Sequence, residues 1–466
     1  MFAAGAWEAG QCRNWVCKAF LVPKPDNPDG SKNWRIIVDL RPINAFCEAM
    51  GFKMETLGKL SEMGLEKDSL MWSFGVKDGF YAVGVDPKHR GRDFFCFELP
   101  DGTLVRYASL PMGWSHSPAI FGELMAVLTR RLRSPGAPVA RQLLQTEPTT
   151  VPRVGGRRQR LVKVITVKPA EEKEALRTAV EVLPYCDDFL CWLPGKQGVR
   201  TAAGATPTAV IIARDRVQSI LDELGITRHP KKGFWEPTTR VQHLGLIVDT
   251  HLGLYQVSAQ KMAKIRGFAR SIVCRTARNR RLVPARVLAS FTGLVQSVYL
   301  ALPVARMFER TLHDVLASKS HWEANVRLTK TARRDLEWWS VLPAKWNGRR
   351  IWRRSATRKL YSDASMFAWG GHLVGDQAKT AHGMFHGLEK EHITVKELRA
   401  TQHTVSAFAP ELAGHHVQFE EDNQAVVYIV RSRTSRDHVL FKLVRRFYAC
   451  SIFTRSRSTC DTVLRR

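Results

Sequence analysis

Hydrophobic and polar positions along the first half of the chain predict a mixture of short strands and helices. Two apolar runs flank the turn sequence PDNPDGS within residues 20–39, a pattern typical of a β-hairpin. The segment KDGFYAVGV follows an apolar run and indicates a strand that ends in a turn. Residues 118–133 repeat apolar positions with helical spacing, and arginines fill the last turn. This half is therefore expected to be of mixed α and β structure.

The rest of the pattern predicts a helical middle and a second strand-rich region. Residues 215–224 have helical spacing, and a hairpin is expected shortly after His243. From residue 261 to about residue 346 the spacing stays helical, and after the basic linker NGRRIWRRSATRK a strand-like pattern begins at Leu360. An irregular stretch at 134–170 is rich in Arg, Pro and Thr. We interpret it as a flexible basic insertion suited to phosphate contact.

Two adjacent acids interrupt the apolar pattern. Asp187 and Asp188 of the quartet YCDD follow Val182 and Leu183 and precede the apolar residues 189–192. Paired carboxylates in buried strands repel each other and lose hydration, so a cation must neutralise them. A divalent metal ion is the expected partner. The alternative is a surface β-turn in which both acids face water, because Asp is common in turns.

The net charge predicts a polyanionic partner. The 466 residues include 71 Lys and Arg against 43 Asp and Glu, a formal net charge of +28 at pH 7. Basic residues that contact phosphates release condensed counterions, so nucleic acid is the expected partner. The basic residues are spread along the chain and form no basic amphipathic helix. A membrane surface is therefore the weaker interpretation.

Cysteine usage and the absence of apolar segments predict an intracellular protein of the cytoplasm or nucleus. The nine Cys residues, an odd number without a CxxC pair, fit neither a disulfide framework nor a zinc site. The start, MFAAGAWEAG, lacks the basic and apolar regions of a signal peptide. The most apolar stretch, residues 293–305, contains polar residues and Pro303 and is too short to span a membrane.

A series of motifs surrounds YCDD in a set order. WRIIVDLRPIN begins at Trp34, KDGFYAV at Lys77, LPMGWSHSPAIF at Leu110, RHPKKGFWEP at Arg228 and HLGLIVD at His243. In this order and spacing, the series resembles the reverse transcriptases of retroelements, over about the first 260 residues. The resemblance is strongest to DIRS-like (tyrosine-recombinase) retrotransposons, with Gypsy-like elements second.

The resemblance implies an α+β fold: a right-hand polymerase with fingers, palm and thumb, followed by an α/β RNase H-like domain. Fingers and palm are expected at 1–255, a helical thumb and connection at 256–350, and the RNase H-like domain at 357–466. The family uses two metal ions for nucleotidyl transfer. By resemblance, Asp187 is a metal ligand and Asp188 is the supporting carboxylate beside it.

One metal-binding position of the polymerase motif is altered. The family places a carboxylate on the first palm strand, and alignment of KDGFYAV puts Gly75 at that position, three residues before Asp78. Glycine has no side chain to bind a metal. An offset of three along a strand directs Asp78 to the opposite face, so Asp78 is not a simple replacement. We therefore expect DNA synthesis by this chain to be impaired.

The other polymerase positions match the family. The nucleotide-binding positions implied by the resemblance are Lys24, Arg35, Asp78, Phe80, Met112 and Gly113, and Lys232 or its neighbour Lys231 matches the proton donor to pyrophosphate. Phe80 falls at the aromatic gate against a 2′-hydroxyl, which implies deoxynucleoside triphosphates as substrates. The alternatives are a core Phe at 80, a solvated hairpin face for Lys24 and Arg35, and an ordinary surface lysine at 232.

A second set of carboxylates lies near the end of the chain. KLYSDASMFAWGG, ITVKELRATQ and VQFEEDNQAVVYIV resemble the RNase H-like domain, and Asp363, Glu397 and Asp422 match its metal ligands. Two metal ions on these ligands would hydrolyse the RNA strand of a hybrid. Structural alternatives remain, because Thr394 and Glu397 also match a capping box, and Asp422 also matches the N-cap of the next helix.

The family's fourth acidic residue has no clear match. Asp437 comes too soon, and Asp461 lies in a tail, SRSTCDTVLRR, that departs from the family pattern. We therefore expect the RNase H-like domain to be clipped at its C-terminal side.

Together these motifs imply the RNA-directed DNA polymerase of a retrotransposon with an associated RNase H-like domain. The resemblance implies Mg²⁺ or Mn²⁺ as cofactor, and an RNA template, a DNA primer and an RNA–DNA hybrid as nucleic-acid partners. The alternative is a non-catalytic nucleic-acid-binding protein derived from such an element. A protein-interaction scaffold is disfavoured by the high positive charge.

Overall fold

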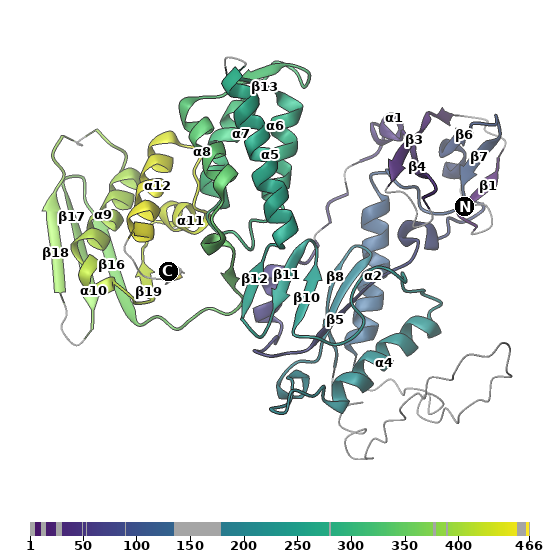
Figure 1. Cartoon of the computed structure of the whole chain (residues 1–466), viewed down its shortest axis with the longest axis horizontal. Coiled ribbons are helices and arrows are strands. Elements are labelled where there is room, and N and C mark those ends of the chain that lie inside the picture. Colours follow the sequence, from purple (N-terminus) through teal and green to yellow (C-terminus); the bar gives the residue numbers. More distant parts are fainter. Residues whose placement is uncertain are drawn as a thin grey trace. The chain divides into compact units, whose positions relative to one another are not determined.

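The structure is a computed structural model that describes residues 5–10, 15–24, 30–48, 50–52, 54–88, 90–134, 179–278, 281–375, 379–387, 390–453 and 463–465. The chain forms two compact units, whose elements are labelled in Figure 1. Unit 1 comprises Met1–Leu244 and Thr250–Leu252, and unit 2 comprises Gly245–Asp249 and Gly253–Arg466. The basic insertion predicted at 134–170 lies outside the described residues, apart from Ser134.

The centre of unit 1 is a three-stranded antiparallel sheet in the order β5-β9-β8. Its strands are β5 (Met71–Gly75), β8 (Glu181–Tyr185) and β9 (Asp188–Trp192), and β8 and β9 form a hairpin. Helices α2 (Ser117–Arg133) and α4 (Thr208–Glu223) pack their apolar residues onto the face of the sheet that carries Phe74 and Phe189. The helix predicted at 118–133 is confirmed, and that predicted at 215–224 starts earlier.

Smaller strands complete unit 1. The predicted hairpin within residues 20–39 is confirmed as β3 (Ala19–Lys24) paired with β4 (Asn33–Val38). A four-stranded sheet in the order β1-β7-β6-β2 contains β1 (Trp7–Ala9), β2 (Val16–Cys17), β6 (Cys96–Glu98) and β7 (Leu104–Tyr107). Other elements are α1 (Arg41–Asn44), β10 (Arg240–His243) and the 3-10 helices η1 (Leu57–Glu62), η2 (Gly79–Ala82), η3 (Arg90–Phe94) and η5 (Lys196–Gly198).

The first part of unit 2 is mainly helical, as predicted. Its helices are α5 (Ala259–Arg278), α6 (Ala285–Gln296), α7 (Arg310–Ala317) and α8 (Lys330–Val341), with 3-10 helices η6 (Ala305–Phe308) and η7 (Ala344–Trp346). The prediction missed a short antiparallel strand pair, β13 (Leu282–Pro284) and β14 (Asn325–Arg327), because three-residue strands have no detectable alternation. Strands β11 (Leu246–Asp249), β12 (Leu254–Gln256) and β15 (Arg349–Arg350) pair antiparallel, and β11 and β12 form a predicted hairpin.

The second part of unit 2 is a five-stranded mixed sheet in the order β18-β17-β16-β19-β20. It contains β16 (Arg358–Ala364), β17 (Ala368–Val374), β18 (Lys379–Met384), β19 (Val417–Glu420) and β20 (Val463–Arg465). The first three strands are antiparallel, whereas β19 pairs parallel with both β16 and β20.

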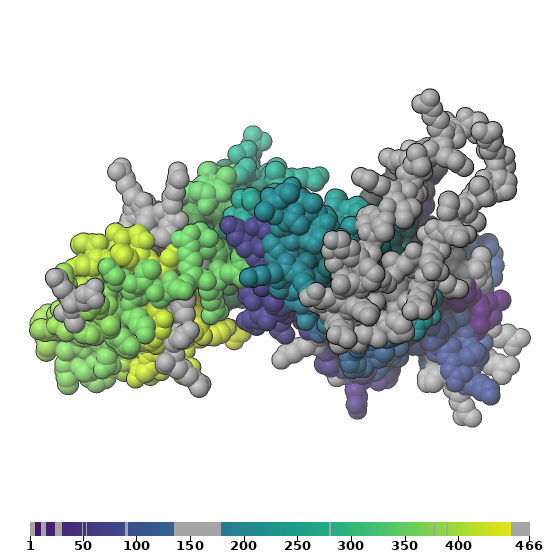
Figure 2. Space-filling model, turned by 90° about the horizontal axis from the view of Figure 1, so that it is seen from below, coloured from purple at the N-terminus to yellow at the C-terminus, as the bar shows by residue number. Residues whose placement is uncertain are grey.

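Helices cover one face of this sheet. They are α9 (Ile393–Ala407), α10 (Ala409–Leu412), α11 (Gln424–Ser432) and α12 (His438–Phe453). Leu360, Phe419 and Leu398 belong to one buried core with residues of α11 and α12. Gly371 lets α9 approach β17 closely, because a Cβ at 371 would lie 2.3 Å from side-chain atoms of Thr404. In Figures 1 and 2, green and yellow segments of unit 2 adjoin, as expected for the packing of α12 against α9.

A partly buried ion pair links the two parts of unit 2. Asp335 on α8 is 1% exposed and accepts hydrogen bonds at 2.8 and 3.0 Å from the guanidinium of Arg445 on α12. The predicted domains at 256–350 and 357–466 therefore lie within one compact unit. Within the described ranges, no helix has both the length and the apolar character that crossing a membrane requires.

Candidate active site

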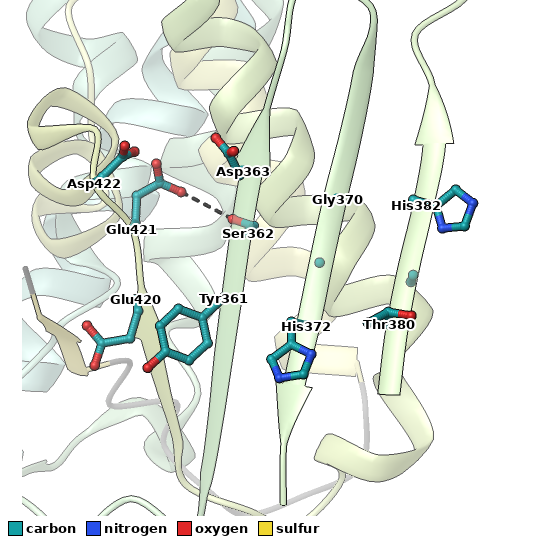
Figure 3. Close-up of a pocket in the computed structure, with 12 residues that line it drawn as sticks. Tyr361, Ser362, Asp363, Gly370, His372, Thr380, His382, Glu420, Glu421 and Asp422 are labelled. Atoms are coloured by element: carbon teal, nitrogen blue, oxygen red, sulfur yellow. Dashed lines mark hydrogen bonds between the residues drawn. The ribbon is translucent and has the colours of Figure 1, made fainter. Parts of the chain in front are cut away.

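Three carboxylates predicted as metal ligands converge in unit 2. Asp363 lies near the end of β16, Glu397 in the second turn of α9, and Asp422 two residues after β19. Each offers one oxygen, and these oxygens lie within 4.8 Å of one another. Parallel pairing of Tyr361 with Glu420 explains part of the arrangement, because Asp363 and Asp422 each follow that pair by two residues. Figure 3 shows both carboxylates at the same end of the sheet.

The local structure does not use these acids as helix caps. Helix α9 begins at Ile393 and its N-cap is His392, whose Nδ1 accepts a hydrogen bond from Thr394 N at 3.2 Å. Helix α11 has Asn423 as N-cap, and Asn423 Oδ1 accepts from two backbone N–H groups. The capping-box alternative for Glu397 and the N-cap alternative for Asp422 are therefore wrong.

Burial strongly raises the pKa of Glu397. It is 6% exposed, and burial together with the charges of Glu421, Asp363 and Asp422 raises its pKa to about 8. Among the described residues, its Oε2 is buried without a hydrogen-bond partner. A buried carboxylate oxygen without a donor, surrounded by further carboxylates, fits a divalent metal ion of the Mg²⁺ or Mn²⁺ type.

A fourth carboxylate, which the sequence analysis missed, lies beside the three. Glu421 is 3% exposed, and its Oε2 accepts hydrogen bonds from Ser362 Oγ at 3.2 Å and Thr401 Oγ1 at 3.3 Å. Burial raises the pKa of Glu421 to about 7. The sequence contained a signal: Glu421 is two residues after the buried Phe419, so strand alternation directs it toward the core.

The other face of the sheet opens into a cavity beside the carboxylates. The cavity is about 690 Å³ in volume, and Figure 3 shows Asp363 and Asp422 at its upper rim. Tyr361, His372 and Glu420 lie further along the same face. Solvent can therefore reach Asp363 and Asp422 directly.

In unit 1, the YCDD acids lie at the β8–β9 hairpin. Cys186 and Asp187 form the turn, with Cys186 in a left-handed conformation at φ 55°, and Asp188 begins β9. The side chain of Asp187 is 30% exposed, so the turn is not the fully solvated one of the alternative interpretation. Burial and the neighbouring charge of Asp187 raise the pKa of Asp188.

The ammonium group of Lys232 forms an ion pair with one of these two acids, Asp187. Its Nζ lies 2.7 Å from Asp187 Oδ2, and this hydrogen bond raises the pKa of Lys232. The adjacent Gly233 holds the segment against β5, because its φ is +82° and a Cβ there would lie 2.4 Å from Ser73 O. Phe234 N also donates to Ser73 O at 2.9 Å. The backbone therefore presents Lys232 to the acids.

Gly75 faces the same acids. It pairs with Asp188 across β5 and β9, and a Cβ at 75 would lie 3.0 Å from Asp188 Oδ1 and 2.9 Å from Lys232 Cδ. Strand β5 ends at Gly75, so the expectation that Asp78 lies on the opposite face of one strand is wrong. Asp78 has φ +62° at the start of η2 and lines a separate cavity of about 450 Å³ with Tyr81.

The fit of unit 1 to a two-metal centre is poor. Within the described residues, the group that includes Asp363 is the only one in which three or more His, Cys, Asp or Glu ligand atoms come together. Unit 1 offers the pair Asp187 and Asp188, and the Lys232 ammonium already neutralises Asp187. Among the described residues, this pair therefore lacks the further carboxylate ligand that a two-metal centre needs.

The predicted nucleotide-binding positions lie on several elements. Lys24 pairs with Asn33 in the β3–β4 hairpin, and exposed Arg35 pairs with Val22 two register positions away. Phe80 is half-buried and packs edge-on against Phe121 with ring centroids 5.2 Å apart, which is the packing that the core alternative requires. No interaction that the structure records joins these positions to Asp187 within the described ranges.

The loop with Met112 and Gly113 is held by a residue that the sequence analysis did not single out. Asn44 Nδ2 donates to Gly113 O at 2.9 Å, and Ser115 N donates to Asn44 Oδ1 at 2.9 Å. Gly113 has φ +103° and Met112 is exposed. The end of the WRIIVDLRPIN motif thus positions the PMGW loop.

Comparison with known proteins gives a short sequence match. No protein-family model matches the chain. The genome polyproteins of Petunia vein clearing virus, isolates Shepherd and Hohn, are 30% identical to this chain over 112 residues. The match covers 24% of this chain and 5% of each polyprotein, so the chain spans a small part of these relatives.

The fold is similar to that of solved foamy viral protease-reverse transcriptase structures. The structure in complex with RNA/DNA hybrid has a TM-score of 0.51 at 16% identity, over 99% of this chain and 51% of that one. The structure in complex with dsDNA has 0.51 at 17% identity, over 94% and 79%. A third, named dRH and in complex with ds DNA, has 0.50 at 15% identity, over 96% and 66%. The predicted α+β class is confirmed, and the chain has a reverse transcriptase-like fold.

Proposed function

We propose that this chain is a retroelement reverse transcriptase whose unit 2 cleaves the RNA strand of RNA–DNA hybrids and whose DNA synthesis is impaired. The observation that carries the proposal is the convergence of Asp363, Glu397 and Asp422, one of which, Glu397, has a buried carboxylate oxygen without a donor. Within the retroelement reverse transcriptases we propose the DIRS-like subgroup, because of the motif series and Met112. The proposed location is intracellular. The proposed domains are those expected from the sequence, with 357–466 as the RNase H-like domain.

The carboxylates of unit 2 have distinct tasks in this proposal. When bound, a divalent metal ion stabilises charge on the phosphate and activates water. Asp363 and Asp422 face the open cavity and would hold the ion where a substrate phosphate can approach. Glu397 holds a proton in the metal-free state and gives it up when the ion binds.

The proposed partners of unit 1 are an RNA template, a DNA primer and deoxynucleoside triphosphates. The net charge of +28 supports binding to phosphates, and the similar foamy viral structures are complexes with dsDNA and with RNA/DNA hybrid. Arg35 and Lys24 would bind the triphosphate, Phe80 would exclude a 2′-hydroxyl, and Lys232 would donate a proton to pyrophosphate. With Gly75 in place of the expected carboxylate, the Lys232 ammonium is paired with Asp187 instead.

Cleavage of a labelled RNA–DNA hybrid in Mg²⁺ or Mn²⁺ tests the hydrolytic part of the proposal. We expect the native chain to release short RNA products and Asp363→Asn to lower the rate by at least about 100-fold, because a metal ligand is lost. Asp437→Asn, an exposed acid of the same unit, is the matched control and should retain activity. The proposal fails if the native chain binds the hybrid but leaves the RNA intact.

Primer extension tests the polymerase part. We expect little incorporation by the native chain and a gain of at least about tenfold for Gly75→Asp, which directs a third carboxylate at Asp188 and Lys232. The backbone permits this change, because β5 at Gly75 has ordinary extended geometry, and the nearest obstacle is the flexible Lys232 chain. Gly84→Asp, with open space around its Cβ, is the matched control. Equal activity of Gly75→Asp and the native chain would count against the assigned defect.

The second candidate function is a non-catalytic nucleic-acid-binding protein derived from such an element. The ion pair between Lys232 and Asp187, together with Gly75, favours it for unit 1, because both features disfavour a metal there. Salt-dependent hybrid binding without cleavage or extension would support this candidate. Cleavage by the native chain would exclude it.

A further inference from the structure

Glu421 stands apart from the predicted metal ligands by its position. It directly precedes Asp422, yet its side chain is buried against Ser362 and Thr401, whereas Asp422 is exposed at the cavity. Figure 3 shows its hydrogen bond with Ser362 just below Asp363. A buried carboxylate is costly unless its surroundings need its charge or its hydrogen bonds.

The hydrogen bonds of Glu421 connect the three elements that carry the ligands. Ser362 directly precedes Asp363 on β16. Thr401 lies one helical turn after Glu397 on α9, and its Oγ1 is also 3.0 Å from the backbone oxygen of Glu397. The second carboxylate oxygen of Glu421 accepts from Asn423 N at 3.3 Å, just beyond Asp422. Two contacts of Glu421, Ser362 and Asn423, are therefore next to a ligand in the chain. The third, Thr401, is hydrogen-bonded to the backbone of Glu397.

We propose that Glu421 is a positioning residue of the unit 2 metal centre, which holds β16, α9 and the end of β19 together and adds a fourth negative charge beside the ligands. The inference rests on the proposed hydrolytic function and goes beyond it by assigning a residue outside the matched acids. Loss of groups that orient metal ligands typically lowers metal affinity about 10- to 100-fold.

Mn²⁺ binding to the full chain at pH 8 tests the inference without any need for activity. The variant Glu421→Gln keeps an acceptor oxygen for Ser362 and Thr401 but removes the charge. We expect its Mn²⁺ affinity at this centre to fall by about tenfold or more, with an unchanged melting temperature in metal-free buffer. The signal of this centre is identified as the part lost in Asp363→Asn.

Glu420→Gln is the matched control, because the same charge is removed one residue earlier on the open face of β19. We expect a change of less than about twofold, since the Glu420 carboxylate accepts from Gln418 on its own strand and, among the described residues, has no recorded side-chain hydrogen bond to β16 or α9. If Glu421→Gln does not fold, Ser362→Ala removes one donor to the same carboxylate and should weaken Mn²⁺ binding roughly threefold.

The outcomes separate this inference from the proposed function. Native-like Mn²⁺ affinity of Glu421→Gln, or of Ser362→Ala if that variant is needed, overturns the role of Glu421 and leaves the hydrolytic proposal intact. Absence of Mn²⁺ binding by the native chain overturns both. A selective loss in Glu421→Gln, with Glu420→Gln unaffected, supports the inference.

Discussion

Metal binding at the unit 2 carboxylates is predicted to strengthen steeply as the pH rises from 6 to 9. The perturbation is the pH itself, and the responsible group is Glu397, whose pKa is about 8 because of burial and neighbouring carboxylates. At that pKa, about one Glu397 in a hundred is ionised at pH 6 and about nine in ten at pH 9. Since a ligand must lose its proton to bind metal, the apparent affinity should rise by nearly two orders of magnitude over this range.

The sign of the effect follows from which state holds the proton. The metal-free chain keeps Glu397 protonated below about pH 8, whereas the metal-bound chain has it ionised. Binding at pH 7 therefore releases about 0.9 proton from this group, and binding at pH 9 releases about 0.1. An exposed glutamate with an ordinary pKa would release almost none at either pH.

Isothermal titration calorimetry with Mn²⁺ measures both quantities. Repeating each titration in two buffers with different ionisation enthalpies gives the number of protons released. The variant Asp363→Asn removes this centre and corrects for Mn²⁺ that binds elsewhere, including at Asp187. An affinity that does not change between pH 7 and pH 9, with no proton released at pH 7, would refute the reasoning about Glu397.

Three further predictions concern stability. In denaturant titrations, Gly233→Ala should lower the free energy of unfolding of unit 1 by about 3 kcal/mol. Gly225 also has a left-handed backbone, but no atom crowds its Cβ position, so Gly225→Ala should lower it by only about 1 kcal/mol. Asp335→Ala should cost about 3 kcal/mol, because it removes a buried carboxylate that pairs with the partly buried Arg445 guanidinium. The more exposed Asp314→Ala should cost under about 0.5 kcal/mol. Without metal, thermal stability should fall from about pH 5 to pH 8, because Glu397 loses its proton more readily when unfolded. Equal losses within either pair, or a melting temperature that rises over this range, would contradict them.

The sequence was most informative where chemistry is local. Apolar residues around Asp187 and Asp188 predicted a buried hairpin, and the structure has that hairpin at β8 and β9. Alignment of KDGFYAV placed Gly75 at a position that faces the acids, and in the structure the Cβ direction of Gly75 points at Asp188. These inferences succeeded because strand alternation and turn chemistry depend on a few neighbouring residues.

The sequence was least informative where a side chain has two local options. Glu397 and Asp422 both matched helix-capping patterns, and only the start points of α9 and α11 excluded that role. Asp78 was judged as part of a strand that ends before it. Glu421 was overlooked because its partners, Ser362 and Thr401, are 59 and 20 residues away in the chain.

The sequence by itself determined the excess positive charge and the order of the elements, and its family resemblance predicted the α+β class and named Asp363, Glu397 and Asp422 as candidate ligands. Only the tertiary structure decided that these three acids meet, that Lys232 neutralises Asp187, and that Glu421 lies beside the metal-binding group. The physical reason is the range of the interactions. Periodicity and turn preference act between neighbours, whereas a shared pocket of charge depends on strands and helices brought together from distant parts of the chain.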